Sequence, residues 1–356
     1  MVVVHIVEAF GGGVYTYLKD LTEFFSKSED VKNIIIYSTK RKEFDKDKMH
    51  FVNSNNVEYI NIDMERSVSP LQDFKSILKI RKILNKIKPD VVHMHSSKAG
   101  ILGRFASLGI VSNTKTFYSP HGYSFLNHEF SPTKKKMFYF IEKYSQNILG
   151  GTTVACGDTE YEIASKIGKS VLVRNGIIPD HVVKYKNEVT NNRLLVGTLG
   201  RISLQKNPKL FNEIAIRFPD FDFLWIGEGD LKDQLTAPNI TVTGWLTNRD
   251  IIMNKLNKLD IYIQTSSWEG LPISIIEAMA LSKPVVATNI IGNKDLVSNQ
   301  ETGFVFTDLN ELDEIFEKLK AKETRLFYGQ NGYKRCSLLF NSQINFNQLS
   351  NIYKNG

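Results

Sequence analysis

The chain of 356 residues has ordinary apolar (42%) and charged (23%) fractions, so we expect two globular domains of average size and exclude the disordered and fibrous classes. Its two cysteines are too few for a disulfide framework or a cysteine metal site, which favours a reducing compartment. The formal net charge is +7, and residues 1–185 carry all of it, with 26 Lys and Arg against 19 Asp and Glu.

The basic front half indicates an anionic partner. Bilayer lipid or a lipid phosphate is favoured over nucleic acid, because no nucleic-acid-binding motif accompanies the charge. Lysines that are merely solvated are an equal alternative. Residues 1–7 lack a basic leader, a cleavage site and the apolar length of a membrane span, so we expect a first strand and a cytosolic protein.

A strand, a glycine loop and a helix are expected at the start of the chain. The loop is Gly11-Gly12-Gly13, and apolar residues at helical spacing follow it, namely Leu18, Leu21 and Phe25. This order is typical of a Rossmann-like unit. The G-x-G-x-x-G pattern is incomplete, which makes a nicotinamide-dependent oxidoreductase a weak alternative.

Strands are expected over residues 33–37 and 57–62, followed by an amphipathic, lysine-rich helix over 70–88. The expected apolar side of this helix consists of Ile77, Leu78, Ile80, Ile83, Leu84 and Ile87. The other side carries Lys75, Lys79, Arg81, Lys82, Lys86 and Lys88. Such a helix more often packs on a sheet with its charges in water than rests on a membrane.

Two patterns invite a metal interpretation, and we expect neither to bind metal. The strand 89–95 contains His93 and His95, which share one face because they are two residues apart, but no third ligand is evident. The Asp-x-Asp triplets are interpreted as solvated flanks of strands and loops; they are Asp45/Asp47 and Asp220/Asp222.

The following strand, residues 116–120, delivers His121 to a loop at the carboxyl edge of the sheet, where ligands bind. Residues 134–136 are lysines in a segment rich in aromatic side chains, a mixture that suits lipid headgroups.

A polar segment without periodicity, residues 178–192, marks the expected domain boundary. A second Rossmann-like unit then begins with a strand that ends at Gly200, and two cations follow, Arg201 and Lys206. An arginine fork and a lysine point charge together can neutralise phosphate oxygens without a metal ion.

The stretch 260–280 combines a buried strand, a bend and a helix. Gly270 would take a dihedral angle that a side chain resists. Amides that could then point out of the helix start and attract phosphate are those of Leu271, Ile273 and Ser274. Glu269 precedes the helix and Glu277 lies about two turns into it. Two carboxylates beside an anion site suit a sugar or ribose next to a phosphate, whereas an ordinary helix start is the alternative.

Residues 269–277, with the strand 283–288 after them, resemble the E-x7-E motif of the family 4 retaining glycosyltransferases. Gly200, Arg201 and Lys206 resemble the G-R-x4-K signature of that family.

The front half carries the same resemblance. Residues 95–100 and 119–123 are similar to the acceptor-side pattern of family 4 enzymes that build bacterial capsule, O-antigen and exopolysaccharide chains. Nearly the whole chain is covered. One departure concerns Asn293 and Asp295, which stand where the family usually has a glycine and a glutamate.

The resemblance implies an α/β protein of the GT-B fold, with two Rossmann-like domains facing across a cleft. Residues 1–178 would bind the acceptor and residues 190–335 the nucleotide-sugar. The C-terminal helix, 340–356, would pack back on the first domain.

The resemblance also implies roles for individual residues. Arg201 and Lys206 would hold the donor diphosphate, Glu277 the ribose, and Glu269 the sugar. The other implied donor residues are Gly12, Gly13, Gly200, Trp245, Leu246, Gly270, Leu271 and Ile273. On the acceptor side they are Ser97 and Lys98. The implied catalytic residues are Glu269, Arg201, Lys206 and His121, the last lying under the donor sugar.

The implied reaction retains the anomeric configuration and needs neither cofactor nor metal. We expect a front-face displacement in which the departing phosphate accepts the proton of the acceptor hydroxyl. By analogy with polysaccharide assembly, the donor would be a uridine diphosphate sugar, an N-acetylated hexose. The acceptor would be a lipid-linked saccharide of the undecaprenyl diphosphate type, met by a peripheral enzyme on the inner face of the cell membrane.

Two further alternatives keep this shape. A non-hydrolysing nucleotide-sugar epimerase would act on the donor with no acceptor present. A binding protein that has lost activity is disfavoured, because the glutamate, arginine, lysine and histidine set is intact.

Overall fold

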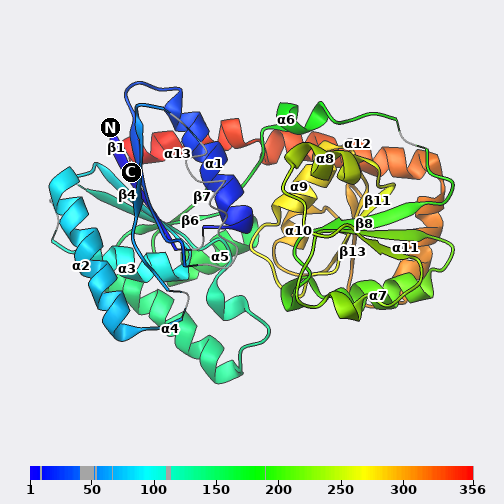
Figure 1. The fold of residues 1–356 in the computed structure, drawn as a ribbon, viewed down its shortest axis with the longest axis horizontal. Helices are drawn as coiled ribbons and strands as arrows, with labels where there is room; N and C mark the ends of the chain where they lie inside the picture. Colours follow the sequence, from blue (N-terminus) through cyan, green and yellow to red (C-terminus); the bar gives the residue numbers. More distant parts are fainter. Residues whose placement is uncertain are drawn as a thin grey trace. The chain divides into compact units, whose positions relative to one another are not determined.

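The structure is a computed structural model that describes residues 1–8, 10–40, 52, 54–65, 67–109, 114–188 and 190–355. The chain forms two compact units (Figure 1). Unit 1 comprises Met1–Asn175 and Ser342–Gly356, and unit 2 comprises Gly176–Asn341. The Asp45/Asp47 triplet lies outside the described residues, while Asp222 begins a strand and pairs with Arg193 at 3.3 Å, both half exposed.

Unit 1 is built on a seven-stranded parallel sheet in the order β3-β2-β1-β4-β5-β6-β7. The strands are β1 (Val2–Val7), β2 (Lys32–Tyr37), β3 (Val57–Asn61), β4 (Val91–His95), β5 (Lys115–Ser119), β6 (Thr152–Ala155) and β7 (Ser170–Leu172). Strands that are buried on both faces are mostly apolar, as Val2–Val7 is apart from His5.

Helices cover both faces of this sheet (Figure 1). One face carries α2 (Pro70–Ile87), α3 (Ser97–Ser107), α4 (Pro132–Leu149) and α5 (Asp158–Ile167). The other carries α1 (Gly12–Ser26) and α13 (Ser342–Asn355), whose Phe346, Leu349 and Tyr353 join the core beneath α1. The C-terminal helix is therefore part of unit 1, although 166 residues of unit 2 precede it.

Unit 2 has a six-stranded parallel sheet in the order β10-β9-β8-β11-β12-β13. Its strands are β8 (Leu195–Leu199), β9 (Asp222–Ile226), β10 (Ile240–Val242), β11 (Ile261–Gln264), β12 (Val285–Thr288) and β13 (Gly303–Phe306). Its helices are α6 (Pro179–Val183), α7 (Pro208–Arg217), α8 (Arg249–Asn257), α9 (Ile273–Ala280), α10 (Asn293–Leu296), α11 (Glu311–Lys320) and α12 (Lys322–Leu339). The α/β fold with two Rossmann-like units, expected from the sequence, is confirmed.

The strand order reverses between β1 and β4 in unit 1 and between β8 and β11 in unit 2. In open parallel sheets, ligands bind at the carboxyl ends of the strands beside such a reversal. The loops and helix starts that follow these four strands hold most of the residues singled out in the sequence, from Gly12 and Ser97 to Arg201 and Glu269.

Helix α2 differs from its prediction. Ile80 and Leu84 are buried as expected, but Leu78 is 49% exposed and lies in an outward row with Leu71 and Phe74. The buried residues of the helix are only Ser76, Ile80 and Leu84, so apolar and basic residues are exposed together on its outer side. Among the described residues, no helix is long and apolar enough to cross a membrane.

Candidate functional site

Glu269 lies at the centre of a hydrogen-bonded cluster in the loop after β11. Its side chain is 8% exposed. Oxygen Oε1 accepts from Lys206 Nζ at 2.7 Å, Ser266 Oγ at 2.7 Å and Gln264 Nε2 at 3.0 Å. Oxygen Oε2 accepts from Gln205 Nε2 at 3.2 Å. The carboxylate is therefore held in one orientation, with its charge balanced by a cation.

Lys206 is the cation of this pair and comes from the loop after β8. Burial disfavours its charged form, but the carboxylate of Glu269 outweighs this and raises the pKa of Lys206 above its ordinary value. Lys206 therefore carries a positive charge at neutral pH inside a protein environment, where a charge acts more strongly than in water.

Gly200 makes room for this lysine. Its φ is +152°, and a Cβ atom there would lie 3.1 Å from Lys206 Cε. The glycine carbonyl accepts from Trp225 Nε1 at 2.8 Å, which fixes the start of the loop. The next residue, Arg201, forms an ion pair with Asp230 at 2.8 Å, and its side chain is 38% exposed. The predicted Gly200, Arg201 and Lys206 thus lie on one loop of unit 2. The side chains of the two cations, Arg201 and Lys206, are partly accessible to a ligand.

Helix α9 begins at Ile273, with Pro272 as the residue before its first turn. Among the described residues, the amide nitrogens of Leu271, Ile273 and Ser274 have no hydrogen-bond partner, as expected at a helix start. These amides give the loop after β11 three donors for an anion.

The dihedral angle predicted for Gly270 is wrong, because Gly270 is not among the residues with positive φ. The residue that needs glycine here is Gly292, with φ +85°. A Cβ atom on Gly292 would lie 2.5 Å from the carbonyl oxygen of Gly270. Asn293, which follows it, is buried and donates from Nδ2 to the Thr288 hydroxyl at 3.0 Å.

Glu277 lies in the second turn of α9, is 3% exposed, and pairs with Arg249 at 2.5 Å. Arg249 is the first residue of α8, which Asn248 caps with its side chain. The sequence prediction included Glu277 and missed Arg249. Of the two residues proposed from the preceding loop, Trp245 is 59% exposed and Leu246 is half-buried.

In unit 1, the glycines after β1 leave open space. Gly12 has φ +56°, and a Cβ atom on it would have no neighbour within 4 Å among the residues that the structure describes. Gly13 is exposed. Ser97 begins α3 and accepts from Ser124 Oγ at 3.0 Å. Lys98 does not point freely outward, because its Nζ lies 2.6 Å from Asp73 Oδ2 and its side chain is only 12% exposed.

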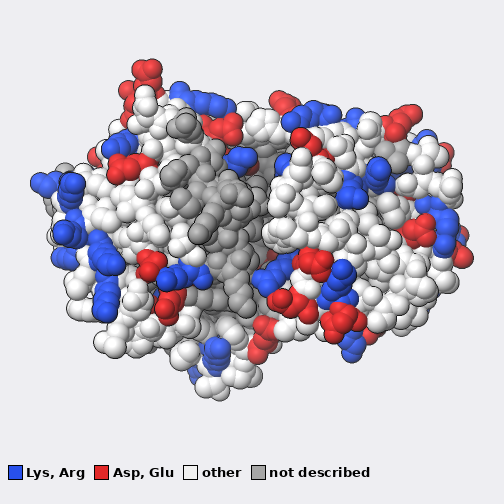
Figure 2. Space-filling model, viewed as in Figure 1, with Lys and Arg blue, Asp and Glu red and all other residues white. Residues whose placement is uncertain are grey.

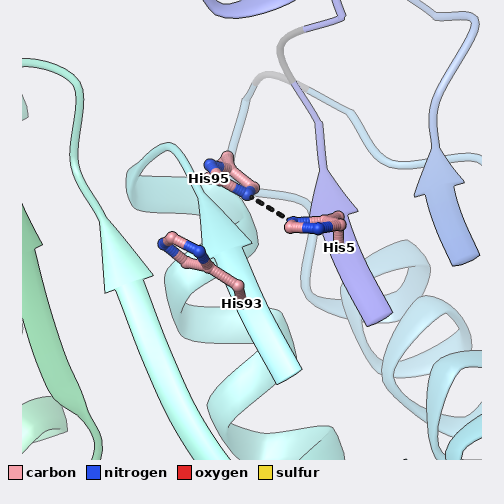
Figure 3. Close-up of side chains that lie close together, drawn as sticks. All are labelled: His5, His93 and His95. Carbon is pink, nitrogen blue, oxygen red and sulfur yellow. Dashed lines mark hydrogen bonds between the residues drawn. The ribbon is translucent and has the colours of Figure 1, made fainter. Parts of the chain in front are cut away.

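His121 lies in the loop after β5 with φ +52° and is one of four neighbouring histidines. Its Nε2 lies 3.1 Å from His95 Nδ1, and His95 Nε2 lies 3.1 Å from His5 Nδ1. Figure 3 shows His5 on β1 beside His93 and His95 on β4. Burial lowers the pKa of His5 to about 4 and that of His93, His95 and His121 below the ordinary value, so the cluster is neutral at pH 7.

The expectation that His93 and His95 have no third partner is therefore wrong. One nitrogen each from His5, His93 and His95 lies within 4.8 Å of the others, an arrangement that could hold a metal ion. The pairing of β1 with β4 places His5 directly opposite His93, and this register was not predictable from the spacing of two histidines on one strand.

Two family models match this chain. Residues 13–156 match the model described as "Glycosyl transferase 4-like", and residues 193–321 match "Glycosyl transferases group 1". The matches fall in unit 1 and unit 2, respectively.

Curated relatives are similar over most of their length. The chain is 29% identical to a UDP-Gal:alpha-D-GlcNAc-diphosphoundecaprenol alpha-1,3-galactosyltransferase of Escherichia coli, over 71% of each chain. It is 26% identical to the capsular polysaccharide biosynthesis glycosyltransferase CapM of Staphylococcus aureus, over 82% of this chain and 83% of that one.

Solved structures share the fold. Sucrose-phosphate synthase from Thermosynechococcus elongatus superposes with a TM-score of 0.81 at 15% identity, covering 99% of this chain and 98% of that one. HepE of Anabaena, in complex with UDP and glucose, superposes with a TM-score of 0.78 at 17% identity and 99% coverage of both chains.

Proposed function

Because this chain belongs to the family 4 glycosyltransferases, we propose that it transfers a sugar from a nucleotide diphosphate bound by unit 2 to a lipid-linked glycan bound by unit 1. The observation that carries the donor assignment is the Lys206–Glu269 pair beside the unpaired amides at the start of α9. This places a cation, three amide donors and a carboxylate together, the set that a sugar diphosphate needs.

The cations account for a reaction without metal. Breaking the bond to the sugar leaves negative charge on the nucleotide diphosphate. Lys206 keeps its proton at neutral pH. The guanidinium of Arg201 is a second cation on the same loop, and its forked N–H groups can bind two phosphate oxygens at once. We assign both to the stabilisation of the departing diphosphate, the usual dominant contribution in such sites.

We propose retention by front-face displacement. Glu269 is a poor candidate for a nucleophile, because its two oxygens already accept four hydrogen bonds and face Lys206. It is suited instead to accept a hydrogen bond from a hydroxyl of the sugar. The acceptor hydroxyl would then attack on the side that the phosphate leaves, and that phosphate would take its proton.

The remaining donor contacts are assigned to the loop before α8 and to α9. Glu277 would bind the ribose hydroxyls, with Arg249 holding the carboxylate in place. Trp245 and Leu246 would lie by the base. A uridine nucleotide is supported by two proteins of similar sequence or fold, one named for UDP-Gal and one in complex with UDP. An N-acetylated hexose remains our choice of sugar by analogy with polysaccharide assembly.

In unit 1, Gly12 and Gly13 would leave room for both the donor sugar and the acceptor glycan. Ser97 and His121 would contact the reacting sugars. Lys98 would act indirectly, through its pair with Asp73. A relative acts on a diphosphoundecaprenol-linked sugar, and others belong to capsule and O-antigen biosynthesis, so we place this enzyme in surface polysaccharide assembly.

We further propose that unit 1 rests on an anionic membrane through the α2–α4 surface, defined by Leu71, Phe74, Leu78, Met137, Tyr144 and Ile148 with the exposed lysines of the same two helices. Leu71 is 82% and Ile148 is 74% exposed. Each helix shows its outward apolar residues at spacings of three, four or seven, and α3 lies between them.

Charge supports the same surface. Figure 2 shows Lys and Arg gathered over α2, and Lys134 and Lys136 lie exposed at the start of α4. Apolar side chains among lysines suit the boundary between headgroups and acyl chains of an anionic bilayer, where a lipid-linked acceptor is found.

The proposed donor site is tested by binding of nucleotides and nucleotide-sugars without added metal. All three tryptophans, at 225, 245 and 268, belong to unit 2, so their fluorescence reports its ligands and its unfolding. We expect UDP and one UDP-sugar to raise the unfolding temperature and quench Trp245, and Arg201→Ala to abolish both effects. Trp245→Phe is the control for the optical signal.

Transfer itself is then tested with that donor and a lipid-linked saccharide. A new glycosidic product with retained configuration supports the proposal, and its persistence in chelator supports metal independence. No response to any nucleotide would contradict the donor site. Conversion of the UDP-sugar to an epimer with no acceptor present would identify an epimerase instead.

A further inference from the structure

One buried carboxylate of unit 1 has no part in the proposed reaction. Glu160 is the third residue of α5 and is 1% exposed. Its Oε2 accepts from the amide of Cys156 at 2.7 Å, and its Oε1 accepts from the amide of Gly122 at 2.8 Å. The carboxylate therefore joins the loop after β5 to the loop after β6, at the carboxyl ends of two paired strands.

The surroundings of Glu160 suit a negative charge. Both of its oxygens face N–H donors, so the ionised form, which only accepts, fits them best. The start of α5 adds the positive end of the helix dipole. Hydrogen bonds to an ionised acceptor are about twice as strong as those between neutral groups. Glu160 therefore holds the Gly122 amide more firmly than a neutral side chain of the same size.

The amide of Gly122 belongs to the peptide bond that follows His121. The φ of His121 is +52°, in the left-handed region, which costs conformational energy for a residue with a side chain. On the other side of His121, the ring of the buried Pro120 restricts the chain. His121 therefore lies between two restrained residues, and the bond from Gly122 to Glu160 opposes the rotation that would relieve its left-handed backbone.

This backbone conformation places the His121 ring against two buried side chains. Its Nε2 lies 3.1 Å from His95 Nδ1, and its ring meets the ring of Tyr17 edge-on, with the centroids 4.9 Å apart. A backbone rotation at His121 would move the ring away from both. Because misplacing a reacting group by about 1 Å can cost about a hundredfold in rate, the conformation of this loop matters to the reaction.

We propose that Glu160 is a positioning residue that holds His121 in place through the amide of Gly122. It acts through the loop after β5 and is not itself a catalytic residue. The role of His121 in transfer rests on the proposed function, whereas its placement by Glu160 is a property of unit 1 alone.

The first test follows the His121 ring by NMR in the full chain with isotopically labelled histidine. His121→Gln identifies its signals by their loss. Burial lowers the pKa of His121 to about 4, so in the wild type these signals should stay constant from about pH 8 to about pH 5.5. Burial also lowers the pKa of His95 and raises that of Tyr17, so neither neighbour titrates in this range. Glu160→Leu removes both acceptor oxygens, so the His121 signals should shift and should titrate nearer the ordinary pKa of 6.5 as the ring meets water.

Gln146→Leu is the matched control. Gln146 is 5% exposed and also joins backbone segments, but at the amino ends of β6 and β7, where its Nε2 donates to the carbonyls of Gly151 and Lys169. The substitution removes buried hydrogen bonds at the opposite ends of the strands and should leave the His121 signals unchanged. Identical His121 signals in wild type and Glu160→Leu, or the same change in both variants, would overturn the proposal.

Glu160→Gln keeps the proposal testable if Glu160→Leu does not fold. It keeps the size of the side chain and one acceptor oxygen, so one of the two amides stays bonded and the other does not. Amide hydrogen exchange identifies which one. Faster exchange of the Gly122 amide should accompany changed His121 signals, and unchanged exchange should accompany unchanged signals. Either of the opposite combinations would overturn the proposal.

Turnover separates this proposal from the proposed function. Glu160→Leu should lower kcat about tenfold or more and leave the donor KM within about twofold, because the donor is assigned to unit 2. Gln146→Leu should keep kcat within about twofold of the wild type.

A double variant shows whether Glu160 acts through His121. Adding Glu160→Leu to His121→Gln should lower kcat no further, because the ring that Glu160 positions is already gone. A further fall of about tenfold would overturn the proposal, since Glu160 would then act independently of His121. If His121→Gln alone keeps full turnover, the assigned role of His121 in transfer fails, while the spectra still decide whether Glu160 holds it in place.

Discussion

Lys206→Ala would leave the Glu269 carboxylate buried without its cation. Removing one partner of a buried ion pair costs about 3–5 kcal/mol. Three donors from neighbouring side chains remain on the carboxylate, and the lysine side chain was 17% exposed, so water can partly replace it. We therefore expect unit 2 to lose about 2–3 kcal/mol of its free energy of unfolding.

The assay is urea unfolding followed by tryptophan fluorescence, which reports unit 2 alone. Lys209→Ala is the control, since Lys209 pairs with Glu213 at 3.9 Å but is 79% exposed and should contribute less than about 0.5 kcal/mol. Lys206→Met combined with Glu269→Gln should recover most of the loss, because neither charge is then left buried. Equal stability of Lys206→Ala and Lys209→Ala would refute the reasoning.

The pH dependence of the stability that Lys206 contributes follows from the direction in which its pKa is shifted. The pKa of Lys206 is raised in the folded protein above its ordinary value of 10.5. Its contribution is therefore complete below pH 10.5 and is lost as the pH rises through the folded pKa. The stability difference between wild type and Lys206→Ala should stay constant from about pH 7 to 9 and shrink only above about pH 10.5. A difference that disappears near neutral pH would contradict the assignment.

Three further outcomes are expected. Arg249→Met leaves the buried Glu277 without its cation, so it should lower the free energy of unfolding in urea by about 1–2 kcal/mol and raise the KM for the donor. Unchanged values of both would show that Arg249 does not hold the Glu277 carboxylate in place. Gly292→Ala places a Cβ atom 2.5 Å from a carbonyl oxygen at φ +85° and should cost about 2 kcal/mol or more, which a wild-type unfolding curve would disprove. Ile148→Glu should weaken cosedimentation with anionic vesicles about tenfold without changing turnover on a water-soluble acceptor. The control Ile216→Glu replaces a residue of unit 2 that is 59% exposed and should leave cosedimentation unchanged. Equal effects of the two substitutions on cosedimentation would exclude the α2–α4 surface.

Local sequence was sufficient for features that lie within one strand, loop and helix. The alternation of apolar runs with amphipathic segments predicted two Rossmann-like units. The run of Glu269 to Glu277 determined where α9 begins and which carboxylates flank its first turn. These features depend on backbone geometry over a few residues. The number of residues between two side chains therefore fixes how far apart they lie in the folded strand or helix.

Local reasoning failed where a neighbouring segment decides the outcome. The need for glycine belongs to Gly292, because its backbone passes the carbonyl of Gly270 from another loop. Leu78 was expected on the buried side of α2, but it is 49% exposed in the folded protein. Helical periodicity predicts an apolar face and cannot say how much of it a neighbour covers.

The chemistry of the candidate sites was decided by pairs that are distant in sequence. Lys206 and Glu269 are 63 residues apart, His5 and His95 are 90 apart, and Tyr353 reaches His93 across 260. The sequence supplied these side chains, but parallel strand order and register place them within hydrogen-bonding distance. Burial then sets which of them are charged, since removal from water favours neutral histidines and requires each buried carboxylate to have a partner.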